Sequence, residues 1–115
     1  FLVAAVPGGI ETRHIFDERV LAAMQSHTHL INISRGDVVE ELALISALQA
    51  GSIGGAGLDV YEYEPKVPKE LIELENVTLL PHLGTAALEV RTAMGLMAID
   101  NLKAFFAGKV LPNVV

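Results

Sequence analysis

The amino-acid sequence predicts an α/β fold, in which helices cover both faces of a parallel sheet. Four short runs of apolar residues lack the polar alternation of a half-exposed strand, and helical patterns separate them along the chain. Buried strands that alternate with helices are typical of parallel sheets. Right-handed crossovers then bring the carboxyl ends of the strands to one edge of the sheet, where open sheets of this kind bind ligands.

The predicted strands are bounded by residues that favour turns. Pro7-Gly8-Gly9 follows the first strand, Ser34-Arg35-Gly36 the second and Pro81 the fourth. The third strand is rich in glycine in its first half, which indicates a close approach by another backbone or by a ligand. The sequence therefore predicts strands at residues 1–6, 30–33, 53–60 and 77–80.

The helices are predicted from apolar spacing and from residues typical of helix ends. Asp17 is a good N-cap, and apolar residues follow it at helical spacing. A helix at residues 40–50 places Leu42, Ile45 and Leu48 on one face and ends at Gly51. A short helical turn is expected at residues 71–74 and one long helix at residues 86–107.

The composition narrows the classes of function. The chain has 115 residues, no cysteine and a net charge of −6. Without cysteine it forms no disulfide and no thiolate metal site, and it has no dense basic run of the kind that binds nucleic acid. No apolar run is long enough for a membrane span, so a soluble, cytoplasmic protein is expected. His27 and His29 lack further ligands at suitable spacing, so no metal site is expected.

Chemically capable side chains follow three of the predicted strands. Arg35 comes after the second strand, Asp59 and Glu64 after the third, and His82 after the fourth. Arg35 can grip a carboxylate with two parallel N–H donors. His82 can exchange a proton near neutral pH, and a nearby Glu64 would orient its ring. With Asp59 as an acceptor for an amide, this set fits the reduction of a 2-keto acid by a nicotinamide.

Each of these residues also has a purely structural interpretation. Arg35 could cap nearby carbonyl groups, and Asp59 could stabilise a turn after its strand. Glu62 competes with Glu64 as the partner of the histidine. His82 could be structural because it follows a proline. His14 is interpreted as a residue near a helix start.

Three segments, in order and in register, resemble signature regions of the D-isomer-specific 2-hydroxyacid dehydrogenases: INISRGDVVEE, GAGLDVYEYEP and NVTLLPHLGT. The glyoxylate/hydroxypyruvate reductase and D-mandelate dehydrogenase-like branch is the most similar. The resemblance implies part of a doubly wound, Rossmann-like sheet, NAD or NADP as cofactor, a small 2-keto or 2-hydroxy acid as substrate, and a homodimer. It also implies that residues 1–82 are the C-terminal half of the NAD(P)-binding domain. Residues 83–115 would be a hinge and a helix that crosses to a substrate domain.

The resemblance also implies roles for individual residues. Arg35 would bind the substrate carboxylate, His82 would donate the proton to the keto oxygen, and Glu64 would pair with His82. Asp59 would hold the nicotinamide carboxamide. The other residues expected at the cofactor are those of the nicotinamide side, Ile33, Ser34, Arg35, His82 and Gly84, and those of a loop along the adenosine half, Val6, Pro7 and Thr12.

The sequence departs from the family pattern in two respects: it lacks the N-terminal part of the substrate domain, and it lacks the glycine turn and the residue that reads the ribose 2′ position. It has no G-x-G-x-x-G turn to hold the pyrophosphate. The chain also begins at Phe1, as if within a strand, so it is expected to be part of a longer protein and to have little activity alone. Two alternatives stay open: formate dehydrogenase, which typically has glutamine where Glu64 stands, and an NAD-sensing corepressor-like binding protein of the same fold.

Overall fold

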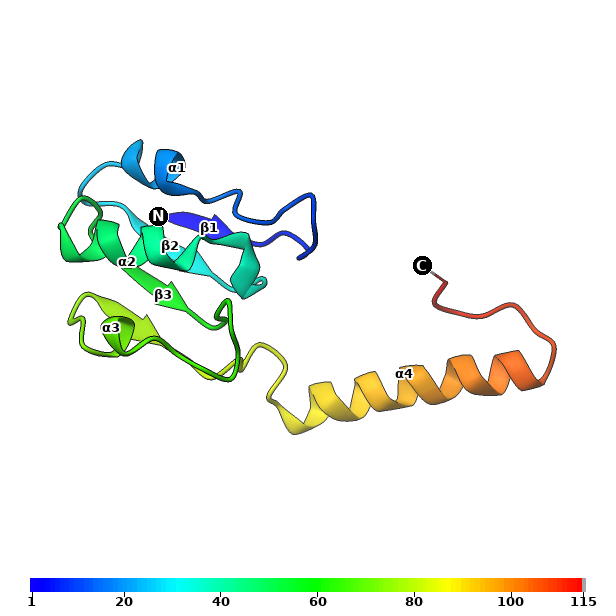
Figure 1. The fold of residues 1–115 in the computed structure, drawn as a ribbon. Helices are drawn as coiled ribbons and strands as arrows, with labels where there is room; N and C mark the ends of the chain where they lie inside the picture. Colours follow the sequence, from blue (N-terminus) through cyan, green and yellow to red (C-terminus); the bar gives the residue numbers. More distant parts are fainter. Residues whose placement is uncertain (115) are drawn as a thin grey trace. The chain divides into compact units, whose positions relative to one another are not determined.

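A computed structural model describes residues 1–114, which divide into two units, the first Phe1–Leu83 and the second beginning at Gly84. All the strands in the described part of the chain lie in the first unit, together with three short α-helices. The second unit is built on one long helix, α4 (Leu88–Phe106). Figure 1 traces both units along the sequence.

The first unit contains a four-stranded sheet in which every neighbouring pair of strands is parallel. The strands follow one another across the sheet in chain order: β1 (Leu2–Ala4), β2 (His29–Asn32), β3 (Gly55–Leu58) and β4 (Val77–Leu79). The prediction of parallel strands is therefore confirmed. Strands β1, β3 and β4 are shorter than the runs predicted for them, because ladder pairing covers only part of each run, whereas β2 has the predicted length but begins one residue earlier. The segments that leave the four strands start from the same edge of the sheet.

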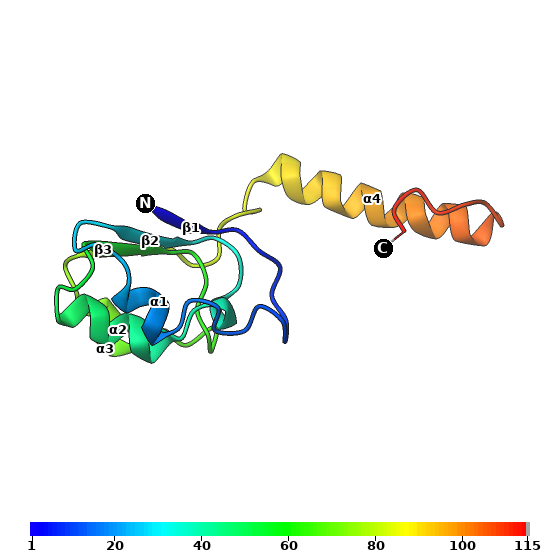
Figure 2. The same cartoon turned by 90° about the horizontal axis from the view of Figure 1, so that it is seen from above.

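Three helices pack against one face of this sheet: α1 (Glu18–Ala22), α2 (Glu41–Gln49) and α3 (Lys69–Ile72). Figure 2 shows them on the same side of the strands. The expectation of helices on both faces is wrong for residues 1–83. Apolar side chains on the uncovered face are accordingly exposed: Val3 in β1 at 51% and Ile33, directly after β2, at 59%. The continuous apolar runs of these strands are therefore buried on only one face of the sheet in residues 1–83.

The core lies between the sheet and these helices. Leu30 from β2, Leu21 from α1, Leu44 from α2 and Leu71 from α3 are all fully or almost fully buried. The predicted N-cap of α1 is confirmed, since the Asp17 carboxylate accepts a hydrogen bond from the Val20 N–H at 3.0 Å. Side chains from every layer thus meet in one apolar cluster.

Helix α2 faces the core in a different phase from the predicted one. Leu42 is 77% exposed, whereas Glu41, Leu44, Ile45 and Leu48 are buried. The run ELALISAL allows two helical phases, and the observed phase turns the Glu41 carboxylate inward to accept the Glu62 N–H at 3.3 Å. As predicted, the helix is followed by Gly51, whose φ of 64° suits a residue without a side chain.

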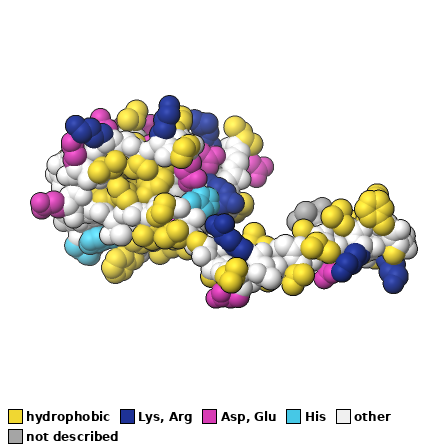
Figure 3. Space-filling view, turned by 90° about the horizontal axis from the view of Figure 1, so that it is seen from below, with side chains coloured by type: hydrophobic (Ala, Val, Ile, Leu, Met, Phe, Trp, Pro, Cys, Tyr) yellow, Lys and Arg dark blue, Asp and Glu magenta, His cyan; other side chains and the backbone are white. Residues whose placement is uncertain are grey.

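Helix α4 (Leu88–Phe106) forms most of the second unit and has no buried residue within it. The long helix was predicted at residues 86–107, so both of its ends are close to expectation. After the helix, the chain folds back so that Asn113 and Asn101 exchange two hydrogen bonds, of 2.9 Å and 3.2 Å. Figure 3 shows exposed hydrophobic side chains along this helix and on the first unit. Among residues 1–114, no helix combines the length and apolar character that crossing a membrane requires.

The turn after β2 touches the turn after β3 at Gly36, the first residue of the 3-10 helix η1 (Gly36–Val38). A Cβ atom on Gly36 would overlap the carbonyl group of Tyr61 and the backbone nitrogen of Glu62. Those atoms belong to the backbone and have no flexible end that could move aside. Only glycine therefore fits at this point.

We predict that Gly36→Ala lowers the free energy of unfolding of the first unit by about 1–3 kcal/mol or more, as overpacking does. Urea titration followed by tyrosine fluorescence measures it, because both tyrosines, Tyr61 and Tyr63, lie in this unit. Gly95→Ala is the matched control: it lies in α4 and its Cβ would meet nothing within 4 Å. Equal unfolding midpoints for Gly36→Ala and the unchanged chain would contradict the close contact.

Candidate active site

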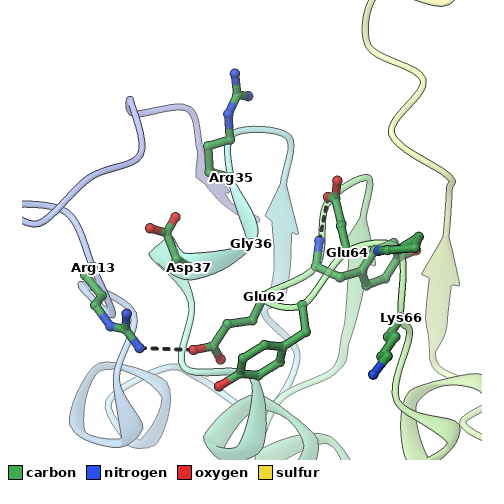
Figure 4. Close-up of a pocket in the computed structure, with 10 residues that line it drawn as sticks. Arg13, Arg35, Gly36, Asp37, Glu62, Glu64 and Lys66 are labelled. Atoms are coloured by element: carbon green, nitrogen blue, oxygen red, sulfur yellow. Dashed lines mark hydrogen bonds and ion pairs between the residues drawn. The ribbon is translucent and has the colours of Figure 1, made fainter.

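Three segments at the carboxyl edge of the sheet carry Arg35, Glu64 and His82. Figure 4 shows the side chains of Arg35 and Glu64 pointing to the same side of the loops that bear them. Both line an open cavity of about 750 Å³. Glu64 and His82 line a second, smaller cavity of about 160 Å³. Because Glu64 belongs to both, the fold brings a guanidinium, a carboxylate and an imidazole to one region.

Glu64 is the carboxylate that contacts the histidine. Its Oε2 atom lies 2.9 Å from Nδ1 of His82, and its Oε1 atom accepts the Tyr61 N–H at 3.0 Å. Glu62, the competing candidate, points elsewhere and pairs with His14 at 2.9 Å. His14 lies in the loop shortly before α1, close to the helix start as expected, but its pairing with Glu62 was not predicted.

The contact with Glu64 determines how the His82 ring can act. An ionised carboxylate only accepts hydrogen bonds, so Nδ1 of His82 carries a proton and Nε2 is the ring atom left for proton exchange. The backbone of His82 has a φ of 55°, which is uncommon for a residue other than glycine. Such a conformation persists when the surrounding contacts enforce it, and the Glu64 hydrogen bond is one of them.

Several interactions change the pKa of the Glu64 carboxyl group. Partial burial alone would raise this pKa, but hydrogen bonds from His82 and from the Tyr61 N–H lower it. The charges of His82 and Arg35 lower it further, and the net result is a pKa below the ordinary value. Glu64 is therefore an ionised acceptor for His82 at neutral pH.

Tyr61 anchors the turn that carries Glu64. Its hydroxyl donates to the Leu80 carbonyl at 2.8 Å, just after β4, and lies 3.3 Å from the Leu58 carbonyl of β3. Burial raises the pKa of the Tyr61 phenol, so it stays protonated as a donor. Tyr61 thus joins the ends of the two strands whose following segments bear Glu64 and His82.

Asn32 shapes the turn that carries Arg35, and sequence reasoning missed it. Its Oδ1 accepts from the backbone N–H and the hydroxyl of Ser34, at 3.0 Å and 2.9 Å, and its Nδ2 donates to the Arg35 carbonyl at 2.9 Å. Asn32 is 1% exposed, and a polar residue at the end of an apolar strand was the signal that could have identified it. Arg35 donates from Nη1 to the Ser34 carbonyl at 2.7 Å, so it caps a carbonyl as well as lining the cavity.

The residues expected at the cofactor differ in burial and in their hydrogen-bond partners. The Thr12 hydroxyl donates to the Pro7 carbonyl at 2.7 Å and closes the loop that begins at Val6. Ser34 is buried, with its hydroxyl engaged by Asn32, whereas the Ile33 side chain is exposed. The Asp59 carboxylate accepts the Leu83 N–H at 2.7 Å, so it has the turn-stabilising role considered for it. Gly84 lies in the second unit.

We predict that the Glu64 hydrogen bonds stabilise the first unit at neutral pH and less in acid. A carboxyl group with a lowered pKa stabilises the folded state above its ordinary pKa, and this stabilisation is lost as the pH falls through the folded value. The stability difference between the unchanged chain and Glu64→Gln should therefore shrink between about pH 6 and pH 3, from a value below about 1 kcal/mol because both side chains are partly exposed.

Chemical denaturation at a series of pH values measures this difference. Glu75→Gln, which removes an exposed carboxylate from the same unit, controls for the change in net charge. A stability difference for Glu64→Gln that stays constant or grows toward low pH would contradict the assigned interaction.

Comparison with known proteins matches the chain to one family. The family model described as D-isomer specific 2-hydroxyacid dehydrogenase, NAD binding domain, matches residues 1–84. A glyoxylate/hydroxypyruvate reductase of Arabidopsis thaliana is 52% identical over 110 residues, which are 96% of this chain and 35% of that protein. A hydroxyphenylpyruvate reductase of Plectranthus scutellarioides is 50% identical over the same shares of the two chains.

Solved structures agree. The NADPH-dependent glyoxylate/hydroxypyruvate reductase from Sinorhizobium meliloti, in complex with NADP and malonate, superposes with a TM-score of 0.97 at 45% identity, over 99% of this chain and 36% of that one. The holo form of D-mandelate dehydrogenase from Rhodotorula graminis gives 0.92 at 40% identity, over 96% of this chain and 32% of that one. This chain thus spans about a third of the length of these relatives. The chain belongs to the D-isomer-specific 2-hydroxyacid dehydrogenase family and matches its NAD-binding domain.

Proposed function

We propose that the chain is the C-terminal part of an NAD(P)-dependent D-2-hydroxyacid dehydrogenase. The enzyme would transfer a hydride between the nicotinamide and a small 2-keto or 2-hydroxy acid, as in glyoxylate/hydroxypyruvate reductases. The proposal rests on one observation: Oε2 of Glu64 lies 2.9 Å from Nδ1 of His82, and Glu64 also lines the cavity that Arg35 lines. The family assignment and the relatives named as glyoxylate/hydroxypyruvate reductases support it.

In this proposal His82 exchanges the proton of the reaction. Its Nδ1 faces Glu64, so Nε2 donates a proton to the keto oxygen during reduction and accepts it back during oxidation. Glu64 fixes the orientation of the ring. The carboxylate can do so because its own lowered pKa keeps it ionised as an acceptor.

Arg35 binds the substrate in the same proposal. A guanidinium matches a carboxylate with two parallel hydrogen bonds, and Arg35 is exposed in the cavity that Glu64 also lines. The substrate carboxylate would then hold the keto carbon near His82. Arg35 would also polarise the keto oxygen, so loss of its side chain should affect both substrate binding and turnover.

The residues at the carboxyl edge suit a nicotinamide nucleotide. Asp59 is an acceptor fit for a carboxamide NH₂ group, and Ile33 presents an exposed apolar side chain at the end of β2. Val6, Pro7 and Thr12 would lie along the adenosine half, while Ser34 and Gly84 would contact the nicotinamide side through the backbone. When bound, the cofactor supplies or accepts the hydride.

The proposal extends to the whole enzyme. Residues 83–115 would act as a hinge and as a helix that returns to the substrate domain, and the enzyme would be a cytoplasmic homodimer that binds neither nucleic acid nor membrane. The large apolar side chains exposed along α4, among them Leu88, Leu102 and Phe106, support a role in contacts with further protein surface.

We predict that His82→Ala in the full-length enzyme lowers kcat by about 10²–10⁴-fold, the usual cost of losing a general acid, with little change in cofactor affinity. Arg35→Ala should also raise the KM for the keto acid. Steady-state assays with glyoxylate, hydroxypyruvate and bulkier aryl keto acids, each with NADH and NADPH, measure both effects.

His27→Ala is the matched control, because His27 is exposed in the segment that precedes β2, away from the carboxyl edge. An unchanged kcat for His82→Ala would show that the proton donor is another group. Tight NADH or NADPH binding by the unchanged enzyme with no turnover of any keto acid would favour the corepressor-like alternative.

A further inference from the structure

Glu62 lies two residues from Glu64 but has a different set of partners. In Figure 4 its side chain points toward Arg13, whereas Glu64 points to the side of Arg35. The Glu62 side chain is only 9% exposed, and its Oε1 lies 2.9 Å from Nε2 of His14 and 3.5 Å from Nη2 of Arg13. A carboxylate this buried is costly unless it is paired, so these two contacts hold it in place.

The backbone of Glu62 is fixed as well. Its N–H donates to Oε2 of Glu41, the buried first residue of α2, at 3.3 Å. The peptide group between Tyr61 and Glu62 also packs directly on Gly36, with no room for a side chain there. Glu62 is therefore held by α2, by the turn after β2 and by His14 and Arg13.

The other end of this connection is the loop before α1. The backbone of His14 has a φ of 51°, and its N–H donates to the Asp37 carbonyl at 2.8 Å. Thr12 accepts the Ile15 N–H at 3.3 Å and closes the same loop onto Pro7. The ring of His14 is thus presented to Glu62 by a loop that has its own network of hydrogen bonds.

A displacement of Glu62 would affect Glu64 through Tyr61, which precedes Glu62 and hydrogen-bonds to the Glu64 carboxylate. The Tyr61 N–H, one peptide away from Glu62, donates to Oε1 of Glu64 at 3.0 Å, and Oε2 of the same carboxylate contacts His82. The Tyr61 hydroxyl binds the Leu80 carbonyl in the strand end that leads to His82. The Tyr61 N–H belongs to the Val60–Tyr61 peptide, which adjoins the Tyr61–Glu62 peptide, so the orientation of the Glu64 carboxylate depends on how the Tyr61–Glu62 peptide holds Tyr61.

We propose that Glu62 is a positioning residue, whose pairing with His14 and Arg13 fixes the Tyr61–Glu62 peptide so that Glu64 meets Nδ1 of His82. Through this pairing the loop at residues 9–16 is coupled to the orientation of the His82 ring. The structural part of the proposal concerns only this chain. Its consequence for turnover rests on the function proposed above.

The structural part is tested by nitrogen NMR of the histidine rings in the 115-residue chain. In the unchanged chain, neutral His82 should favour the tautomer protonated at Nδ1, because Glu64 accepts from that atom. Glu62→Ala should abolish this preference, and His14→Gln should weaken it. The ring signals of His27 and His29, which lie before or at the start of β2, report whether the sheet is intact.

Two further variants keep the test decisive. Glu62→Gln retains an oxygen that can accept from His14 and should preserve more of the tautomer preference than Glu62→Ala. If Glu62→Ala fails to fold, Glu62→Gln and His14→Gln supply the answer. Glu73→Ala is the matched control. It removes an exposed glutamate that pairs with Lys69 at the end of α3, and it should leave the tautomer of His82 unchanged. A His82 tautomer that is the same in every variant would overturn the proposal.

The consequence for turnover is tested separately in the full-length enzyme. Glu62→Gln should lower kcat by about 10-fold, less than loss of the general acid itself, while the KM for the keto acid, set by Arg35, stays close to its original value. A larger effect on KM than on kcat would contradict a role through His82. If the unchanged enzyme has no turnover, the proposed function fails, but the NMR result still decides the positioning role.

Discussion

The contact between Gly36 and the Tyr61–Glu62 peptide is the constraint on which the rest of this site depends. It joins the turn that presents Arg35 to the turn that presents Glu64, backbone against backbone. Because parallel strands β2 and β3 deliver both turns to the same edge of the sheet, this contact sets the distance between the two side chains. Protein interiors are packed so closely that even one added methyl group disturbs the packing. The guanidinium and the carboxylate therefore share a rigid support.

Much of this arrangement could be predicted from the sequence, because its causes are local. Runs of apolar residues ended by Pro7, by the Ser34-Arg35-Gly36 turn and by Pro81 located three of the strands, and the parallel topology followed from the order of strands and helices. Asp17 and Gly51 marked helix ends through properties of single residues. Once the strands were known to be parallel, the grouping of Arg35, Glu64 and His82 at one edge followed.

Other features depend on contacts between distant segments and could not be predicted in this way. The run ELALISAL fits two helical phases, and the phase was decided by Glu41, which turns inward toward a backbone N–H twenty-one residues further along the chain. Apart from the family resemblance, which favours Glu64, nothing in the sequence tells which of the two glutamates meets a histidine, and the pairing of Glu62 with His14 was not predicted. The uncovered face of the sheet also could not be deduced, since a continuous apolar run in a strand does not tell on which faces of the sheet this chain places its helices.

The hydrogen bonds of Asn32 have a consequence for what the turn after β2 can tolerate. The amide oxygen accepts two hydrogen bonds from Ser34, and the amide nitrogen donates one to the Arg35 carbonyl. Aspartate has the same shape but would place a negatively charged oxygen against that carbonyl. Leucine would remove the partner of the buried Ser34 N–H and hydroxyl and leave the Arg35 carbonyl with only the Val38 N–H. The architecture of this turn therefore requires a side chain that donates at one end and accepts at the other, and among residues of this length asparagine alone does both.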